Sequence, residues 1–480
     1  MKGTRATSAG LDLHLDLSGG RPRARLESAL REAVRGGRLM AGTAMPSSRA
    51  LARDLGLARN TVAEAYGQLV AEGWLSARHG SGTWVTERAG QLRSVGATAD
   101  RSAARGPRYD LRPGVPDVSA FPRAAWLAAA RKALAAASAT ELSYADPRGL
   151  PGLRIALAEY LARARGVAVT PDRIVVCAGF SQGMELVCEV LRARGARELA
   201  AEAYGHPQHR GIAARSGLRV LPVPVDERGA DVAVLPGSHA PVRQDGPPRL
   251  GAALLTPAHQ FPLGVILAPD RRRQVADWAA TTGAVVIEDD YDGEFRYDRQ
   301  AVGALQPLAP ESVVYAGTAS KSLAPGLRLG WLVLPADLLD PIVDAKRAAG
   351  RLSSSLDQLT LAELIRSGGY DRQVRRARLA YRRRRDRLIG ALATAVPEVR
   401  VVGIAAGLHA LVRLPGGVSE RDVVTRAAAR GLAVHGLATT RAGEQDLGPA
   451  LIVGYATPPP YAFSTAVARL CAALREVIGA

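Results

Sequence analysis

Residues 312–331 read SVVYAGTASKSLAPGLRLGW, a short apolar stretch followed by hydroxyl side chains and a lysine. The apolar part predicts a buried strand, and Thr318, Ser320 and Lys321 come directly after it. Lys321 is one of only four lysines among 63 basic residues, and Arg328 lies seven positions beyond it. A lysine at the floor of a cleft loses its proton more readily through desolvation and can then attack an aldehyde. The stretch therefore predicts a site for carbonyl chemistry.

Three other predicted strands also end in residues that carry chemistry. Residues 285–292 read VVIEDDYD, and because neighbouring carboxylates repel one another, this crowding indicates a cationic partner or a metal. Residues 174–183 read IVVCAGFSQG, where a glycine-bracketed turn leads into a helix at residues 184–195. The N–H groups at a helix start can hold a phosphate, although such turns are also common in purely structural roles. Residues 254–264 read LLTPAHQFPLG and supply a polar turn suited to the same cleft.

The larger part of the chain, about residues 108–480, alternates short apolar runs with amphipathic helices. Helices such as residues 270–283 separate these runs, a pattern typical of an α/β fold with a buried, mostly parallel sheet covered on both faces. In such a sheet, ligands bind at the carboxyl ends of the strands. The four strand ends described above are therefore expected to meet in one cleft.

Length and composition exclude several classes of protein. A chain of 480 residues with 47% hydrophobic and 22% charged residues is long enough for more than one domain and is not disordered throughout. No apolar stretch approaches the roughly 18 residues of a membrane span, and acids stand where a signal peptide needs apolar residues, so we expect a cytoplasmic protein without a membrane partner. Cys177, Cys188 and Cys471 lack metal or disulfide spacing and are interpreted as core thiols.

A linker-like segment divides the chain. Residues 87–107 lack hydrophobic periodicity and are rich in Gly, Ser, Ala and charge. They follow a helical module at residues 12–86. The net charge of +18 favours a polyanionic partner such as nucleic acid, but a solvated basic surface would give the same total. The motifs of the module must decide whether it binds DNA.

The N-terminal module carries three predicted helices and a hairpin. Apolar positions at helical spacing predict a first helix that ends at Gly36. Ser47 is positioned to cap a second helix that Gly56 ends, and a third runs from about residue 59 to 73. The short connection between the last two fits helix-turn-helix geometry, which leaves the later helix free to enter a major groove. Residues 74–85 predict a two-stranded hairpin with a small polar tip, a wing.

This arrangement resembles the winged helix-turn-helix of the GntR family of bacterial transcription regulators over nearly the whole of residues 12–86, which implies double-stranded DNA as a partner. Arginine can bind guanine bidentately or grip a phosphate, and hydroxyl and N–H groups at a helix start fix the register on DNA. By matched position, the residues expected to touch DNA are Arg49, Arg59, Asn60, Thr61, His79 and Gly80. For any single arginine the alternative is a plain surface position. Ala63 replaces a further basic contact of some relatives, so their DNA sequence preference does not transfer.

The larger module resembles the fold-type I pyridoxal-phosphate enzymes in their aminotransferase-like form. The resemblance implies pyridoxal 5′-phosphate as cofactor, with Lys321 as its Schiff base, Asp289 pairing with the pyridine nitrogen and Tyr291 bonding the ring hydroxyl. Charge agrees, because a carboxylate keeps the ring nitrogen protonated and an arginine neutralises the phosphate. The other residues implied for the cofactor are Ser181, Gln182, Thr318, Ser320 and Arg328 for the phosphate, His259 in the polar turn, and Tyr144 reaching across from the other subunit.

Together, the two modules resemble the MocR subfamily of GntR regulators, to which the segments TPAHQFP, EDDYDGEFRY and SKSLAPGLR are closely similar. One departure bears on the ligand. Aminotransferases and amino-acid-sensing relatives hold a substrate carboxylate with an arginine near the C-terminus, where this chain has Ile452, and isoleucine cannot bind a carboxylate. Arg413 and Arg441 are alternatives from other positions. His206 stands where an aromatic residue is expected near the cofactor.

The sequence is therefore expected to encode a homodimeric, pyridoxal-phosphate-dependent, DNA-binding transcription regulator without a metal, which senses its effector through the aldimine at Lys321. The effector would be pyridoxal phosphate itself, as in the PdxR branch that controls vitamin B6 synthesis, or an amine without the usual α-carboxylate. The alternatives are an aminotransferase with an accessory N-terminal module, a regulator of amino acid or amine metabolism, and a DNA-binding protein with an inert large domain. The sequence leaves residual transamination open.

A basic run at residues 372–385 is compatible with a helix. Its arginines indicate a solvated helix face. The alternative is a path along which a DNA backbone crosses the large module.

Overall fold

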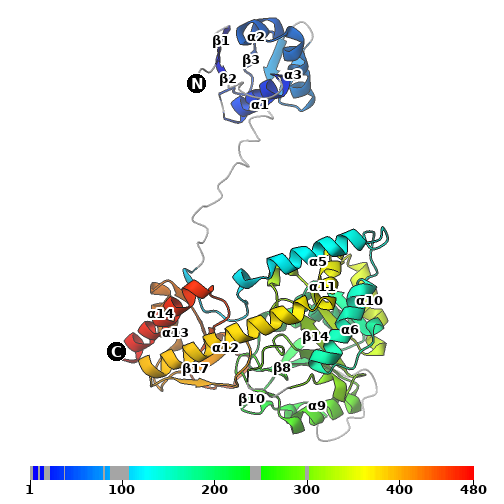
Figure 1. Cartoon of the computed structure of the whole chain (residues 1–480), viewed down its shortest axis with the longest axis vertical. Helices are drawn as coiled ribbons and strands as arrows, with labels where there is room; N and C mark the ends of the chain where they lie inside the picture. The colour runs from blue at the N-terminus through cyan, green and yellow to red at the C-terminus, as the bar shows by residue number, and fades with distance from the viewer. Residues whose placement is uncertain are drawn as a thin grey trace. The chain divides into compact units, whose positions relative to one another are not determined.

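The computed structural model describes residues 4–8, 11–15, 22–36, 38–78, 82–86, 107–237, 250–297 and 302–479. The chain divides into two compact units, Met1–Arg105 and Gly106–Ala480 (Figure 1). The predicted linker, residues 87–107, lies outside the described residues except for Pro107.

The first unit is a three-helix core with a small antiparallel sheet in the order β3-β5-β4. Its elements are α1 (Pro22–Arg35), β3 (Ala44–Met45), α2 (Ser48–Leu55), α3 (Arg59–Ala71), β4 (Leu75–Arg78) and β5 (Gly82–Val85). The helices and the wing hairpin lie where the sequence predicts them. An antiparallel pair that the sequence analysis did not predict, β1 (Thr4–Ser8) and β2 (Leu11–Leu15), precedes them. The buried core includes Leu26, Leu30, Leu51, Val62, Ala65, Tyr66 and Leu69.

Both ends of α2 have the caps that the sequence predicts. The hydroxyl of Ser47 accepts a hydrogen bond from the Ala50 N–H at 3.2 Å, and Gly56 adopts a left-handed φ of 66°, which a residue without a side chain adopts at little cost. The Tyr66 hydroxyl of α3 donates to the Pro46 carbonyl at 3.0 Å. These contacts fix the start of α2 against α3, as a helix-turn-helix requires.

The second unit is built on a seven-stranded sheet in the order β7-β15-β14-β13-β12-β8-β9. Its strands are β7 (Ile174–Cys177), β8 (Glu198–Glu202), β9 (Arg219–Val223), β12 (Leu250–Leu255), β13 (Val285–Asp289), β14 (Val313–Thr318) and β15 (Gly330–Val333). Neighbours pair in parallel except at β15, which is antiparallel to both β14 and β7. The parallel sheet is as expected, but β15 was not predicted. Residues 319–329 are too few for the helical crossover that a parallel neighbour needs, so the chain returns antiparallel.

Helices cover both faces of this sheet, as the sequence predicts. Alternate residues of β13 point to opposite faces, so Val285 and Ile287 join a buried cluster with α7, α8 and α10, whereas Val286 joins one with α9. Helices α6 and α11 form a further buried cluster with Tyr315 of β14. The helices are α5 (Arg123–Ala136), α6 (Pro151–Arg165), α7 (Phe180–Ala193), α8 (Pro207–Arg215), α9 (Pro269–Thr282), α10 (Ala336–Ala348) and α11 (Ser355–Arg366).

The C-terminal part adds a smaller antiparallel sheet in the order β16-β17-β20-β19. Its strands are β16 (Arg400–Val402), β17 (His409–Arg413), β19 (His435–Gly436) and β20 (Ala450–Gly454), with helices α12 (Gly369–Ala395), α13 (Glu420–Ala429) and α14 (Pro460–Ile478). Two short pairs join β6 (Tyr109–Asp110) to β18 (Leu432–Ala433) and β10 (Val225–Asp226) to β11 (Gly229–Ala230). The long helix α12, which contains the basic run, extends from the side of α11 to the side of α14 (Figure 1).

One helix near the predicted cleft differs from its prediction. Helix α7 begins at Phe180, four residues before the predicted start, so Ser181 and Gln182 lie in its first turn. The reason is Gly179, whose φ of 83° lets the chain turn from the strand, which ends at Cys177, into the helix within two residues. Cys177, Cys188 and Cys471 are buried and free, as expected. None of the described helices combines the length and apolar character needed to cross a membrane.

Candidate functional site

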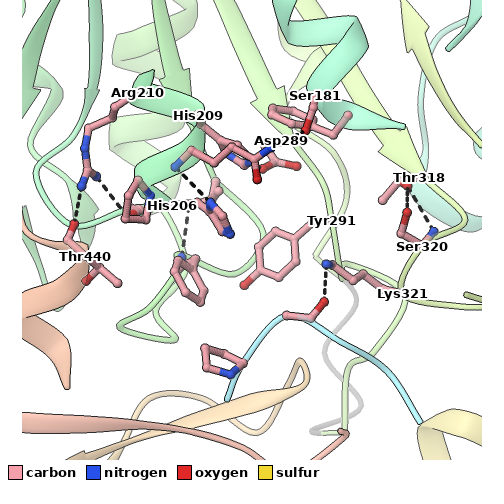
Figure 2. Close-up of a pocket in the computed structure, with 18 of the residues that line it drawn as sticks. Ser181, His206, His209, Arg210, Asp289, Tyr291, Thr318, Ser320, Lys321 and Thr440 are labelled. Atoms are coloured by element: carbon pink, nitrogen blue, oxygen red, sulfur yellow. Dashed lines mark hydrogen bonds and ion pairs between the residues drawn. The ribbon is translucent and has the colours of Figure 1, made fainter. Parts of the chain in front are cut away.

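The carboxyl ends of the parallel strands surround a cavity of about 470 Å³ (Figure 2). All four predicted strand ends contribute to it, together with Pro113 and Gly114 from the segment before α5. The sequence-predicted residues that line the cavity are Ser181, Asp289, Tyr291, Thr318, Ser320, Lys321 and Arg328. The fold thus brings together side chains that lie up to about 150 positions apart in the sequence.

Lys321 follows β14 and points its amine into the cavity. Its Nζ donates a hydrogen bond to the Gly114 carbonyl at 2.5 Å, and Figure 2 shows the amine beside the ring of Tyr291. Burial lowers the pKa of Lys321, and the nearby carboxylates of Asp289 and Asp292 partly oppose that change. A buried amine of this kind is a better nucleophile at neutral pH than an exposed lysine.

Asp289, at the end of β13, lies on the wall of the cavity next to His209. Its side chain is 5% exposed, and Oδ2 lies 3.7 Å from His209 Nδ1. The other oxygen, Oδ1, is buried and has no hydrogen-bond partner among the residues that the structure describes. Burial raises the pKa of Asp289 well above its usual value, and the amine of Lys321 opposes that rise. A cationic N–H group placed at Oδ1 would satisfy the unpaired oxygen and hold the carboxylate in its charged form.

A second polar cluster lies at the start of α7. The first turn of this helix has no side-chain cap, and a Cβ at Gly179 would lie 3.1 Å from the Arg328 guanidinium, so the guanidinium packs closely on the bare backbone. Arg328 adopts a φ of 52°, the one positive φ of a non-glycine residue in the described part of the chain, and donates to the Ala178 carbonyl. Thr318 donates to the Ser320 hydroxyl at 2.9 Å. Free N–H groups, hydroxyls and a guanidinium together suit a phosphate.

These features fit pyridoxal 5′-phosphate. The buried unpaired oxygen of Asp289 suits a protonated ring nitrogen, and the amine of Lys321 suits an aldehyde. The start of α7 with Arg328 would hold the phosphate. When bound, the cofactor supplies a conjugated ring that withdraws electrons from an attached amine.

Three sequence-predicted cofactor residues do not line the cavity of their own chain. The side-chain carbonyl of Gln182 accepts a hydrogen bond from the Ala178 N–H at 2.8 Å, so this residue closes the turn before α7 instead of joining the phosphate cluster. His259 is buried, with Nδ1 at 2.8 Å from Asp292. Tyr144 is 96% exposed.

The structure also places the residues considered for a carboxylate. Ile452 is fully buried in an apolar cluster with Leu411 and Leu437 and does not line the cavity. Neither alternative arginine lines the cavity, because Arg413 donates to the Leu447 carbonyl and Arg441 pairs with Asp446. Neither is therefore placed to replace the missing arginine.

His206, which the sequence analysis placed near the cofactor, lines the cavity, but several other cavity residues were missed. His209 stacks on His206 with ring centroids 4.8 Å apart, and Arg210 donates to the Gly205 and Thr440 carbonyls at 3.0 and 2.9 Å. The signal was the run HPQHR at residues 206–210, of which the sequence analysis used only His206. The lining residues His409, His435, Thr439 and Thr440 come from the C-terminal part, and no local pattern in the sequence announces them.

In the first unit, the residues predicted to touch DNA cluster at helix starts. Arg49 lies in the first turn of α2, and Arg59, Asn60 and Thr61 lie in the first turn of α3. Arg49, Arg59 and Asn60 are exposed, and Thr61 is partly buried. The residue before α3 is Ala58, which offers no side-chain cap, so the N–H groups of the first turn are free for an external acceptor such as a phosphate. His79 and Gly80 lie outside the described residues.

Comparison with known families agrees with both units. Residues 22–85 match the family model of bacterial regulatory proteins of the gntR family, and residues 114–440 match the model of aminotransferase class I and II. The second match covers more than half of the chain, and pyridoxal phosphate is therefore its cofactor. The α-aminoadipate aminotransferase LysN of Thermus thermophilus superposes with a TM-score of 0.68 over 80% of this chain and 96% of its own, at 26% identity.

Several relatives match this chain over most of its length and of their own. The chain is 34% identical to the HTH-type pyridoxine biosynthesis transcriptional regulator PdxR of Corynebacterium glutamicum over 86% of this chain and 87% of the relative. It is 31% identical to the HTH-type transcriptional regulator TauR of Rhodobacter capsulatus over 94% of this chain and 96% of TauR. It is 32% identical to the probable rhizopine catabolism regulatory protein MocR of Rhizobium meliloti over 75% of this chain and 74% of that protein. With a helix-turn-helix head and a lysine-centred cofactor cavity in one polypeptide, the chain belongs to the MocR subfamily of GntR-family transcription regulators.

Proposed function

We propose that this regulator senses a small molecule in the cavity of Lys321 and changes its hold on DNA in response. The observation that carries the proposal is that one chain combines two features. Free N–H groups at the start of α3 lie with the exposed arginines Arg49 of α2 and Arg59 of α3, and the cavity has a nucleophile, an acid and an anion cluster that fit pyridoxal phosphate. For a switch, the ligand must bind one DNA-binding state more tightly than the other. The contacts between the cavity and the ligand must supply that difference in binding free energy.

The effector that fits the cavity best lacks an α-carboxylate. Its lining contains four histidines, His206, His209, His409 and His435, and burial lowers the pKa of each of them, so they are neutral at neutral pH. Of the cationic lining residues, Lys321 and Arg328 are assigned to the cofactor, and Arg210 already donates to two carbonyls. A free carboxylate would therefore lose its water without gaining a charged partner.

Two effector classes remain, pyridoxal phosphate itself and an amine without a carboxylate. The 34% identity to a pyridoxine biosynthesis regulator over 86% of the chain favours the first, and with it control of vitamin B6 synthesis. In either case Lys321, Asp289, Tyr291, Ser181, Thr318, Ser320 and Arg328 would hold the cofactor. Gln182 and His259 would not touch the cofactor; they would hold neighbouring parts of the site in place.

We further propose that the regulator is a homodimer in which Tyr144 completes the partner's cavity. Tyr144 is 96% exposed, and Leu142, Leu127 and Leu134 nearby in the sequence are at least half exposed. Exposed apolar side chains in one region indicate an interface. Sedimentation should give a dimer, and Tyr144→Ala should weaken cofactor binding more than Tyr461→Ala, which is also highly exposed but on α14.

DNA recognition is proposed for the first unit. Arg49, Arg59, Asn60 and Thr61 would contact the duplex from the starts of α2 and α3, and His79 and Gly80 would contact it from the wing. Neither Arg49 nor Arg59 has an ion-pair partner in the described part of the chain, so both side chains are available for phosphate or guanine. The operator sequence would be found by selecting duplexes from a random library with the full-length protein.

The experiment that tests the proposed function measures affinity for such a selected duplex with and without small molecules. The panel contains pyridoxal phosphate and matched pairs that differ by the carboxylate, such as leucine with isopentylamine and phenylalanine with phenethylamine. We expect a response to pyridoxal phosphate or to an amine, and none to its amino acid. A larger response to the amino acids would overturn the proposed effector class. Sustained turnover with an amino donor and a keto acid, without any effect on DNA binding, would favour the aminotransferase alternative.

A further inference from the structure

His259 lies directly behind Tyr291, between this tyrosine and Asp292. Its ring is 2% exposed, and its Nδ1 atom lies 2.8 Å from Asp292 Oδ2 and 3.2 Å from the Tyr291 hydroxyl. The opposite ring nitrogen, Nε2, is buried, and no group in the described part of the chain forms a hydrogen bond with it. The three side chains come from the turn after β12 and the turn after β13. Only Tyr291 reaches the cavity.

The contacts of His259 decide where its proton is. A buried N–H group without an acceptor is costly, so a proton on Nε2 would be unfavourable. A proton on Nδ1 faces a carboxylate oxygen at 2.8 Å, which is the strongest acceptor available. His259 therefore donates Nδ1–H to Asp292, and the Tyr291 oxygen lies at the side of the same N–H. It follows that the Tyr291 hydroxyl cannot donate its own proton to His259.

The Tyr291 proton then has two possible acceptors. One is Asp292, whose carboxylate faces the Tyr291 hydroxyl and whose buried Oδ1 has no hydrogen-bond partner within the described ranges. The other is an oxygen atom of a ligand in the cavity. Burial, followed by the charges of Asp292 and Asp289, raises the pKa of Tyr291 well above its usual value, so the phenol keeps its proton and acts as a donor.

We propose that His259 is a positioning residue, which occupies Asp292 through Nδ1–H so that Tyr291 donates its hydrogen bond into the cavity instead of to Asp292. The inference rests on the proposed role of Tyr291 toward the cofactor's ring oxygen. It assigns His259 no contact with the cofactor. The Asp292–His259 pair sets the direction of a hydrogen bond that a second residue makes.

The groups around the pair are compatible with this role. His409 packs beside His259 with ring centroids 5.2 Å apart, and its Nε2–H donates to the Pro262 carbonyl at 3.1 Å. Burial lowers the pKa of His409 to about 3, so its ring is neutral. Gly407 lies against the pair, because a Cβ there would come within 2.2 Å of the imidazole. The charged groups around His259 and Tyr291 are Asp289, Asp292, Glu202 and Lys321. Of these, Asp292 touches the imidazole.

The test is a pH titration of the visible absorbance of the full-length protein loaded with pyridoxal phosphate. A donor at the ring oxygen favours its deprotonated form, so loss of the donor should raise the pH midpoint. Tyr291→Phe should raise it by about one unit and weaken cofactor binding about tenfold, as expected for a hydrogen bond to a charged group. His259→Gln should do the same in the parent protein and add nothing in a Tyr291→Phe background.

Two further variants separate positioning from general damage. The amide nitrogen of His259→Asn can take the place of Nδ1, so this variant should keep a midpoint near that of the parent, unlike the glutamine variant. Adding Asp292→Asn to His259→Gln replaces the competing carboxylate with a weaker acceptor and should bring the midpoint back toward the parent value. Equal effects of His259→Gln with and without Tyr291, or no recovery in the double variant, would overturn the inference. No effect of Tyr291→Phe alone would instead contradict the proposed role of Tyr291.

Discussion

The imidazole of His209 lies with Nδ1 3.7 Å from Asp289 Oδ2. It stacks on the ring of His206 with centroids 4.8 Å apart and contacts the tilted ring of Phe180 at 4.4 Å. Burial lowers the pKa of His209 well below its usual value, so the ring is neutral and does not cancel the charge of Asp289. The carboxylate is therefore left to pair with a cation in the cavity. Its unpartnered Oδ1 is the atom available for that pair.

Asp289→Asn should weaken binding of pyridoxal phosphate by about 10- to 100-fold, because a charge-assisted hydrogen bond to the ring nitrogen is lost. Absorbance titration of the apo protein measures this directly. Asp344→Asn is the matched control, since Asp344 is 68% exposed on α10 and away from the cavity. Equal affinity of the Asp289 variant and the parent would show that this carboxylate does not pair with the cofactor.

Capture of the cofactor by the apo protein should depend on pH through Lys321. The free amine attacks and the ammonium does not, so the rate should rise with pH and level off near the pKa of the amine. Burial lowers the pKa of Lys321, which places the plateau below the usual value of a lysine, 10.5. Stopped-flow absorbance over a pH series tests this prediction. A rate that still rises at and above that usual value would contradict it.

Two glycines of the first unit should respond in opposite directions to alanine. Gly56→Ala forces a side chain into a left-handed conformation at the end of α2 and should cost about 1 kcal/mol in the free energy of unfolding. Gly67→Ala lies inside α3 with open space around its Cβ and should stabilise the helix by about 0.5–1 kcal/mol. Calorimetry of the full chain resolves the two changes. A Gly56→Ala variant as stable as the parent or more stable would mean that the cap at Gly56 is not formed in solution.

Arg59→Gln should weaken DNA binding, and the weakening should depend on salt. Each lost phosphate contact reduces the slope of log affinity against log salt by about 0.9, so the flatter slope identifies a backbone contact. If Arg59 contacts a base instead, the slope of log affinity against log salt stays the same, and the variant distinguishes less well between duplexes of different sequence. Arg347→Gln, an exposed arginine of α10, should change neither quantity. An Arg59 variant that behaves like this control would remove Arg59 from the interface.

Local patterns in the sequence predicted most of the elements that carry the site. Ser47 and Gly56 predict the two ends of α2, because a serine hydroxyl can cap a helix start and a glycine can end a helix. The apolar runs before Asp289 and Lys321 predict the strands that position these two side chains. Because parallel strands end at the same edge of a sheet, these side chains could be expected to meet. Residues close together in the sequence are sufficient for these predictions.

The rest depended on contacts between distant segments. Strand β15 pairs antiparallel inside an otherwise parallel sheet, which no periodicity reveals. His435 and Thr440 reach the cavity only through the packing of the C-terminal part. His259 and Gln182 stand in the right motifs, but their side chains turn to Asp292 and to the Ala178 backbone. A motif fixes where the backbone passes, and packing fixes which side chains face the ligand.

The most direct test of the central claim compares Lys321→Ala with Lys132→Ala, a lysine whose side chain is 72% exposed. Affinity of each full-length variant for the selected duplex is measured with and without pyridoxal phosphate, together with the visible absorbance of the protein. The parent and the Lys132 variant should take up the cofactor and change their DNA affinity with it, whereas the Lys321 variant should do neither. A Lys321 variant that keeps both the absorbance and the response would contradict the account.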